Sequence, residues 1–407
     1  MENSLKIAKE SQKELLNLTP KLKEKLILDI ADSVKSSKEE IKKANKIDLE
    51  NAKDLSKAMQ DRLKLDDKAL ESIINSLIAT AKLTDPVGKI LDGWVNYAGL
   101  KFSKVTIPIG VVCVIYESRP NVTTEVASLC LKSSNVCVLK GGSEAKHSNL
   151  ALIKCVHEAL EKNGISKEVV TFLDDFKRED TIELIQYDKY IDAIIPRGGS
   201  SLIQFITKNA TIPVIKHDKG VCHIYVDESA CFKEAIKICI NAKYQKPSAC
   251  NAVETILVSE KIADDFLPKL KAEFDALGIE IYGCERVPFG CEKATNESYE
   301  NEYLDLKVNV KVVGGVHEAV EHITKFGSSH SEAILSNNAK NIEFFLNSLD
   351  SACLYVNAST RFSDGFEFGF GGEIGISTNK LHARGPMGLN ELTTYKYKIV
   401  GNGQIRE

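Results

Sequence analysis

The side chain that the sequence places best for nucleophilic chemistry is Cys250, in the stretch YQKPSACNAVETILVSE at residues 244–260. A turn of small residues precedes this thiol and a strand-like run follows it. A thiol at such a strand entrance can be exposed while adjacent backbone N–H groups lower its pKa or hold an oxyanion. The local sequence leaves two interpretations open: a catalytic nucleophile, or one ordinary thiol among the eleven cysteines of the chain.

Two glycine pairs follow predicted strands, in LKGG at residues 139–142 and in PRGG at residues 196–199. Each pair precedes a predicted helix start, and such turns lie at the carboxyl edge of a parallel sheet. Glycines at this edge let backbone N–H groups approach the phosphates of a dinucleotide. Simple turn chemistry explains the same glycines equally well, so both interpretations stay open.

Several familiar signatures are absent from the sequence, namely G-x-x-x-x-G-K-[ST], H-E-x-x-H, G-x-S-x-G and a strand-following G-x-G-x-x-G. The cysteines form no C-x-x-C pair, so we expect neither a disulfide framework nor a metal site. Cys113 and Cys137 lie in apolar strand-like runs, where cysteine behaves as a small hydrophobic residue. His317, His322 and His330 are predicted to be surface or capping residues rather than metal ligands.

Alternating strand-like and helical segments must position these residues. Residues 1–85 show helical spacing of apolar side chains, and residues 90–107 suit a hairpin. One strand–helix alternation starts at GVVCVIYES and a second at VCHIYVD, which predicts an α/β fold with parallel sheets and crossover helices. The closing LTTYKYKIV is an alternating strand that could pair with the hairpin or with another subunit.

Composition excludes several classes of partner. The 407 residues include 53 basic and 57 acidic side chains, so the net charge of -4 gives no reason to expect nucleic acid or an anionic membrane. The most apolar run, VTIPIGVVCVIY, is too short to span a bilayer, and the first residues lack a secretory signal. We therefore expect a cytoplasmic enzyme with reduced thiols and a small-molecule substrate.

Long stretches of the chain, taken together, resemble the aldehyde dehydrogenase superfamily and, within it, the branch that reduces gamma-glutamyl phosphate. The stretches that carry this resemblance include IPIGVVCVIYESRPNVT, VLKGGSEA, IIPRGG, NAKYQKPSACNAVETILV and NASTRFSDGFEFGFGGEIGIST. The resemblance implies two Rossmann-like parallel-sheet domains and a small β extension for oligomerisation. The implied boundaries are 1–89 with 108–219 for an NADP-binding domain, 220–385 for a catalytic domain, and 90–107 with 393–407 for oligomerisation strands.

The resemblance also assigns roles to residues. Cys250 becomes the nucleophile that holds a thioester, and Asn121 in RPNV becomes an amide donor to the oxyanion beside the Cys250 N–H. Lys140 would meet the adenosine ribose, while Gly198 and Gly199 would approach the pyrophosphate.

Two further residues bear on the cofactor. Glu302 in NEYL resembles the acid that binds the nicotinamide ribose, although a solvated acid in an acidic patch stays an alternative. Ser143 stands where relatives that prefer NAD often carry a glutamate. Without that carboxylate a 2′-phosphate is not repelled, so NADPH/NADP+ is the expected cofactor, with Glu144 next door as a conflicting charge.

The segment KHDKG departs from hydrolytic aldehyde dehydrogenases, because it places Lys216 or His217 where those enzymes carry a water-activating glutamate. A thioester on this chain should resist hydrolysis, which suits reduction of L-glutamate 5-phosphate to L-glutamate 5-semialdehyde in proline biosynthesis. Asp218 is the nearby carboxylate that could undercut this argument. A hydrolytic enzyme for another semialdehyde and a catalytically silent protein of the same fold are the alternatives.

The anionic groups of such a substrate need cationic partners. Arg119, His217 and Arg384 are candidates for the phosphate and carboxylate, because arginine forks match these anions. Exposed surface charge is an equal explanation for each of them. A homo-oligomer, a dimer or a tetramer, is expected, and functional coupling to glutamate 5-kinase is a further hypothesis.

Overall fold

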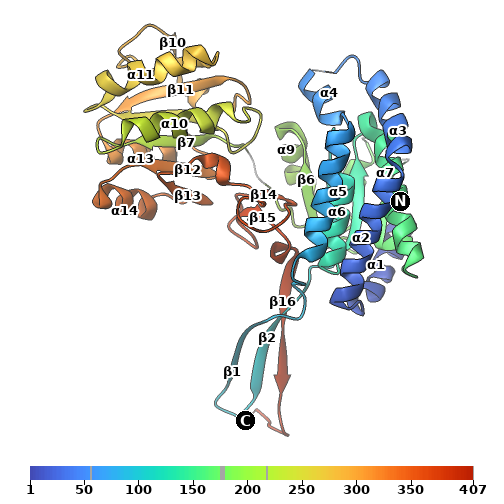
Figure 1. The fold of residues 1–407 in the computed structure, drawn as a ribbon. Helices are drawn as coiled ribbons and strands as arrows, with labels where there is room; N and C mark the ends of the chain where they lie inside the picture. Colours follow the sequence, from blue (N-terminus) through green and yellow to red (C-terminus); the bar gives the residue numbers. More distant parts are fainter. Residues whose placement is uncertain (56, 175–178, 217–218, 407) are drawn as a thin grey trace. The chain divides into compact units, whose positions relative to one another are not determined.

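The computed structural model describes residues 1–55, 57–174, 179–216 and 219–406. The chain forms two compact units, drawn in Figure 1. Unit 1 comprises Met1–Lys216, Gly369–Gly375 and Met387–Glu407, and unit 2 comprises His217–Phe368 and Ile376–Pro386. The short strands β14 (Gly375–Ser377) and β15 (Gly385–Met387) pair with each other. Each of them contains the residue at which the chain changes from one unit to the other. No helix in the described ranges is long and apolar enough to cross a membrane.

Unit 1 opens with helices, as the spacing of apolar residues predicts. They are α1 (Glu2–Leu16), α2 (Pro20–Ser36), α3 (Lys38–Asn51), α4 (Lys57–Leu63) and α5 (Asp67–Lys82). Leu26, Ile30 and Val34 of α2 are fully buried, since their fourfold spacing puts them on one helix face. The Thr19 side chain caps α2 by accepting from Leu22 N, which satisfies one of the free N–H groups at the helix start.

A four-stranded parallel sheet forms the centre of unit 1. Its strands are β3 (Val111–Tyr116), β4 (Val136–Gly141), β5 (Val170–Phe172) and β6 (Ala193–Arg197), in the order β5-β4-β3-β6. The connecting helices are α6 (Asn121–Lys132), α7 (Lys146–Lys162) and α8 (Thr181–Leu184), and α9 (Ser200–Asn209) follows β6. Every residue of β3 is buried, which explains its continuous apolar sequence. The carboxyl ends of these strands meet at one edge of the sheet.

A separate antiparallel sheet in unit 1 pairs the hairpin that follows the first five helices with the last strand, β16 (Figure 1). It contains β1 (Ile90–Val95), β2 (Lys101–Pro108) and β16 (Thr393–Val400), with β2 in the middle. Of the two pairings predicted for the last strand, pairing with the 90–107 hairpin is therefore present. Trp94 stacks on Phe102 with ring centroids 5.0 Å apart and meets Tyr397 edge-on at 5.9 Å.

Unit 2 is built on a seven-stranded sheet in the order β10-β9-β11-β8-β7-β12-β13, and all its pairings are parallel. Its strands are β7 (Cys222–Val226), β8 (Val253–Ser259), β9 (Glu280–Gly283), β10 (Glu292–Lys293), β11 (Lys307–Val313), β12 (Ser331–Leu335) and β13 (Cys353–Val356). Its helices are α10 (Phe232–Tyr244), α11 (Ala263–Ala276), α12 (Asn296–Tyr299), α13 (Val316–Phe326) and α14 (Ala339–Ser348). Two apolar clusters cover the sheet, one under α10 and α11 and the other under α13 and α14.

The prediction of exposed or capping histidines is wrong for two of the three. His322 and His330 are buried, at 3 % and 0 % exposure. Burial lowers the pKa of His322 to about 2, so the ring is neutral and packs among aromatic side chains. The His330 Nδ1 lies 2.9 Å from the Ser331 Oγ. Both histidines belong to the interior of unit 2.

Candidate active site

Cys250 lies in the turn between α10 and β8 and is only half-buried. Two backbone hydrogen bonds close this turn, from Ala249 N to Lys246 O at 3.1 Å and from Ala252 N to Ala249 O at 2.9 Å. Cys113 is fully buried in a core strand, and burial raises the pKa of its thiol to about 12. The local exposure that nucleophilic chemistry needs is therefore present at Cys250.

The backbone of Cys250 packs directly against Gly220, which lies two residues before β7. A Cβ atom on Gly220 would overlap the Cys250 carbonyl oxygen and would lie 2.7 Å from the Cys250 Cα, so no other residue fits here. The Cys222 Sγ donates to the same carbonyl oxygen at 3.3 Å. Burial raises the pKa of Cys222 well above its ordinary value, which keeps this second thiol protonated and able to donate.

Residues beside Cys250 are fixed by the segment that follows β13. Asn251 donates to the Ser363 carbonyl at 2.9 Å, and its own carbonyl accepts from the Thr360 hydroxyl at 2.7 Å. Arg361 in the same segment donates from Nε to Gln245 Oε1 at 2.7 Å. Burial lowers the pKa of Arg361, whereas Asp364 and the Cys250 thiolate raise it. The positive charge of Arg361 near Cys250 favours the thiolate form of that cysteine. The sequence did not single out Arg361.

Glu302 lies in the same part of unit 2. Its Oε1 accepts from Gly220 N at 3.0 Å, so it is tied to the backbone that supports Cys250. Burial raises the pKa of Glu302, and the Gly220 N–H with the ammonium groups of Lys219 and Lys243 lowers it. These contacts disfavour the alternative of a freely solvated acid. Contact with a nicotinamide ribose stays a prediction.

A buried ion pair lies behind this site. The Lys243 Nζ lies 2.8 Å from Glu254 Oε2, and both side chains have 0 % exposure. Burial raises the pKa of Glu254 to about 7, against the lowering effect of Lys243. Neither residue stood out in the sequence, because a lysine in a helix and a glutamate in a strand look like ordinary surface residues.

Asn121, the predicted oxyanion donor, opens α6 in unit 1, directly after the loop that carries Arg119. One helical turn later, Glu125 lies on the same face. Burial raises the pKa of Glu125, while Asn121 and the guanidinium groups of Arg197 and Arg119 lower it and Glu373 raises it. Arg119 is near Asn121 in the sequence, whereas the approach of Arg197 and Glu373 to Glu125 is seen only in the structure.

Arg197, at the end of β6, connects this group to the glycine-rich segment of unit 1. Its Nη1 lies 3.9 Å from Glu373 Oε1, and a Cβ on Gly375 would lie 3.3 Å from the same Nη1. Its Nε is buried and has no hydrogen-bond partner among the residues that the structure describes. Arg197 was seen only as part of the PRGG turn, so its charge is a finding of the structure.

The cofactor residues predicted from the resemblance lie along the carboxyl edge of the unit 1 sheet. Lys140 is the second-last residue of β4, and Gly198 and Gly199 follow β6 just before α9. A Cβ on Gly198 would lie 2.5 Å from Glu117 Oε2 and 2.8 Å from a Leu202 methyl carbon, so a larger residue there would have to move these two side chains. The Gly199 N–H already donates to Glu117 Oε2 at 2.9 Å, so a dinucleotide phosphate at this helix start would have to replace that carboxylate as the acceptor.

Ser143 begins a short 3₁₀ helix (Ser143–Ala145) and is exposed. The neighbouring Glu144 turns its carboxylate toward Ser118, whose N and Oγ donate to Oε1 at 2.6 and 2.8 Å. The Glu144 carboxylate, which conflicts with binding of a 2′-phosphate, is therefore hydrogen-bonded to Ser118 of the same unit.

Two predicted anion-binding residues have different outcomes. Arg384 donates from Nη1 to Asp350 Oδ1 and from Nη2 to the Asp350 carbonyl, both at 2.6 Å, so its fork is occupied within unit 2. His217 lies outside the described residues, as does Asp218. A role of either Arg384 or His217 toward the substrate stays a prediction.

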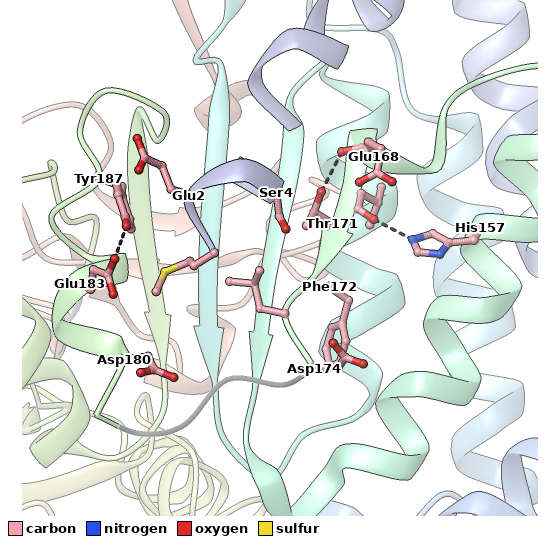
Figure 2. A pocket seen from close by; sticks show the side chains of 13 residues that line it. Glu2, Ser4, His157, Glu168, Thr171, Phe172, Asp174, Asp180, Glu183 and Tyr187 are labelled. Carbon is pink, nitrogen blue, oxygen red and sulfur yellow. Dashed lines mark hydrogen bonds between the residues drawn. The ribbon is translucent and has the colours of Figure 1, made fainter. Parts of the chain in front are cut away.

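A cavity of about 740 Å³ lies elsewhere in unit 1, beside β5 and the start of α1 (Figure 2). Its lining includes the acids Glu2, Glu168, Asp174, Asp180 and Glu183 and none of the predicted site residues. Such a lining repels the phosphates of a nicotinamide cofactor. No group of three metal-ligating side chains occurs in the described parts of the chain.

Comparison with known proteins decides the family. A family model described as "Aldehyde dehydrogenase family" matches residues 1–287. The chain belongs to the aldehyde dehydrogenase family. The expected fold class is confirmed, and the chain is an oxidoreductase that uses a nicotinamide cofactor, as this family does.

Several relatives match from end to end. A gamma-glutamyl phosphate reductase of Nautilia profundicola is 51% identical over 411 residues, covering 100% of both chains. The protein of the same name from Nitratiruptor sp. is 52% identical over 412 residues, again covering 100% of both. The crystal structure of gamma-glutamyl phosphate reductase from Thermotoga maritima has a TM-score of 0.97 at 45% identity, covering 100% of this chain and 99% of that one.

Proposed function

We propose that this chain reduces L-glutamate 5-phosphate to L-glutamate 5-semialdehyde with release of phosphate, using NADPH, as the second step of proline biosynthesis. The observation that carries the proposal is the half-exposed thiol of Cys250 in a chain 51% identical over its full length to a gamma-glutamyl phosphate reductase. The closed turn and the two contacts on its carbonyl oxygen support a nucleophile with a fixed backbone.

The first step is acyl transfer. The Cys250 thiolate attacks the acyl carbon, an S–C bond forms, and the C–O bond to phosphate breaks with the electron pair leaving on phosphate. The Asn121 amide and the Cys250 backbone N–H hold the oxyanion of the tetrahedral intermediate. Arg361, beside the thiolate, favours the ionised sulfur that this attack requires.

The second step is reduction. When bound, the nicotinamide cofactor supplies hydride to the thioester carbon. The S–C bond then breaks, the thiolate leaves, and the aldehyde forms. Lys216 or His217 stands where hydrolytic relatives carry a water-activating glutamate, which protects the thioester from water during the interval between the two steps.

Preference for NADPH is supported by the surroundings of Ser143. Lys140 supplies a cation near the end of β4, and the Glu144 carboxylate is held by two hydrogen bonds from Ser118, which offset part of its repulsion of a 2′-phosphate. Gly198 and Gly199 approach the pyrophosphate, and Glu302 binds the nicotinamide ribose. Comparing NADPH with NADH in wild type and Ser143→Glu tests this, because the added carboxylate should weaken NADPH use selectively.

The substrate's anions need cationic partners. The candidates predicted from the sequence are Arg119, His217 and Arg384. The structure adds two further candidates, Arg197 and Arg361. Arg197 is favoured over Arg384, because the Arg384 fork already binds Asp350.

Assembly and context complete the proposal. Unit 1 carries the NADP-binding residues other than Glu302, unit 2 carries the nucleophile, and the strands within 90–107 and 393–407 join subunits into a dimer or tetramer. The enzyme works in the cytoplasm, and coupling to glutamate 5-kinase would shorten the life of the unstable acyl phosphate in water.

Paired thiol variants test the proposed function. The reaction is followed in reverse, with L-glutamate 5-semialdehyde, NADP+ and phosphate. We expect Cys250→Ser to abolish turnover, while Cys231→Ser, which removes an exposed thiol, keeps wild-type turnover. Retention of activity in Cys250→Ser would refute the nucleophile.

A further inference from the structure

The segment 302–304 is fastened to β8, the strand that begins just after the nucleophile. Leu304 N donates to Glu254 Oε1 at 3.4 Å, and the Tyr303 hydroxyl donates to Asn309 Oδ1 at 2.9 Å. Asn309 in turn donates to the Glu254 carbonyl at 3.2 Å. Leu304 has a φ of +53°, a left-handed conformation that a non-glycine residue keeps only when its surroundings hold it. This segment therefore has one defined conformation.

From this anchored segment, Glu302 reaches the backbone that supports Cys250. Its Oε1 accepts from Gly220 N at 3.0 Å. Gly220 is packed so closely under the Cys250 carbonyl that a single added methyl group would overlap it. Cys222, two residues after Gly220, donates its thiol to the same carbonyl oxygen at 3.3 Å. A continuous line of contacts thus joins Glu302 to the backbone of Cys250.

The carboxylate of Glu302 has a second oxygen. In the described residues, the hydrogen bond to this carboxylate is made at Oε1 alone. Oε2 therefore stays available for the hydroxyls of a nicotinamide ribose. Binding of a ribose would account for the free Oε2 of Glu302. It would not account for the hydrogen bond from Gly220 N to Oε1.

We propose that Glu302 is a positioning residue for Cys250. Its carboxylate fixes Gly220, and Gly220 limits the backbone rotation of Cys250, whose thiol and N–H must both face the acyl group. This inference rests on the proposed function in one respect, because it takes Cys250 as the nucleophile. Positioning by Glu302 differs from ribose binding in one way that can be tested, because it affects Cys250 even when no cofactor is bound.

Two conservative variants separate the hydrogen bond from the charge. Glu302→Gln loses the charge but keeps an oxygen acceptor at the same reach for Gly220 N. Glu302→Asp keeps the charge but is one methylene shorter, so its carboxylate no longer reaches. The same two changes at Glu300, an exposed acid two residues earlier, serve as the matched control.

Acylation by p-nitrophenyl acetate without cofactor is the readout. The Cys250 thiolate attacks the ester carbonyl, the S–C bond forms, the C–O bond breaks, and p-nitrophenolate leaves with the bonding electrons as a stoichiometric burst. We expect both Glu300 variants to stay within about twofold of the wild-type burst rate, and Glu302→Gln, which keeps an acceptor for Gly220 N, to lose less of that rate than Glu302→Asp. Glu302→Asp should be slower by about tenfold, the effect of losing one hydrogen bond to a charged group.

Amide exchange in the peptide containing Gly220, measured on the same samples, distinguishes local loosening from a weakened fold. Faster exchange confined to that peptide is expected in Glu302→Asp and not in Glu302→Gln. Wild-type acylation by Glu302→Asp, unchanged exchange at Gly220, or equal losses in both Glu302 variants would overturn the positioning role. A burst that survives in Cys250→Ser contradicts the proposed function itself, so the two failures are distinguishable.

Discussion

The Lys243 ammonium lies 2.8 Å from the Glu254 carboxylate, and both side chains have 0 % exposure. This buried ion pair joins α10 to β8, the two elements on either side of the Cys250 turn. Removing one partner leaves an uncompensated charge in the interior. We expect Lys243→Met to lower the free energy of unfolding by about 3–5 kcal/mol. Lys243→Met combined with Glu254→Leu should recover most of that loss. Chemical denaturation of the three proteins measures it, and an unaffected Lys243→Met would contradict the pairing.

The same glutamate should make stability depend on pH. Burial raises the pKa of Glu254 from its ordinary 4.5 to about 7 in the folded chain. Because the folded state binds this proton more tightly, the stabilisation is complete below pH 4.5 and is lost as the pH rises to about 7. The difference in unfolding free energy between wild type and Glu254→Gln should fall by up to about 3 kcal/mol across that window. A constant difference would argue against the raised pKa.

Two glycine variants test the packing under Cys250. In Gly220→Ala the new methyl group must displace the Cys250 carbonyl, so we expect turnover to fall by about 100-fold or more, because reacting groups tolerate little misplacement. Gly290→Ala is the matched control, since no atom lies within 4 Å of its added Cβ. Steady-state kinetics and melting curves of both proteins decide the matter. Normal turnover in Gly220→Ala would show that this contact does not hold the nucleophile.

Arg197 should recognise the substrate's anionic groups. We expect Arg197→Gln to lower kcat/KM for L-glutamate 5-semialdehyde by about 10- to 100-fold, the range for losing a charged hydrogen bond. Butanal, which carries no anion, should be oxidised as well by the variant as by wild type. Arg62→Gln, at an exposed position of unit 1, controls for a general change of charge. Equal losses with both aldehydes would assign Arg197 a structural role.

The three-stranded sheet of unit 1 should join subunits. Trp94 is 42% exposed and Tyr397 is 50% exposed, although the two rings are in contact. Exposed aromatic side chains on a sheet edge are costly in water and typical of an interface. Trp94→Glu should shift the mass measured by light scattering toward the monomer, while Lys101→Glu on the neighbouring strand should not. A monomeric wild type would refute this prediction.

The fold was largely predictable, because burial leaves a direct mark on sequence. The apolar run of β3 has no alternation, since both faces of that strand are covered, and Leu26 and Ile30 recur at the period of a helix. The small residues around Cys250 likewise indicated a strand entrance. Such patterns arise from neighbours along the chain, so a single sequence displays them.

The polar interior was not predictable in the same way. Lys243 and Glu254 look like surface residues until the helix and strand that carry them are packed together. Glu125 and Glu373 come close only through the fold. The burial of His322 was missed because its ring packs against Tyr299 and His223, which other elements bring to it. Charge pairing between distant segments has no local period. Asn121 was found only through resemblance to a family.

The dependence of catalysis on phosphate tests the central claim most directly. Purified enzyme is mixed with L-glutamate 5-semialdehyde and NADP+, with and without phosphate, and NADPH is followed by absorbance. The account predicts a single burst of NADPH, one per active site, without phosphate, and continuous turnover once phosphate releases the acyl group from Cys250. Continuous turnover without phosphate would contradict it, because water would then be discharging the thioester.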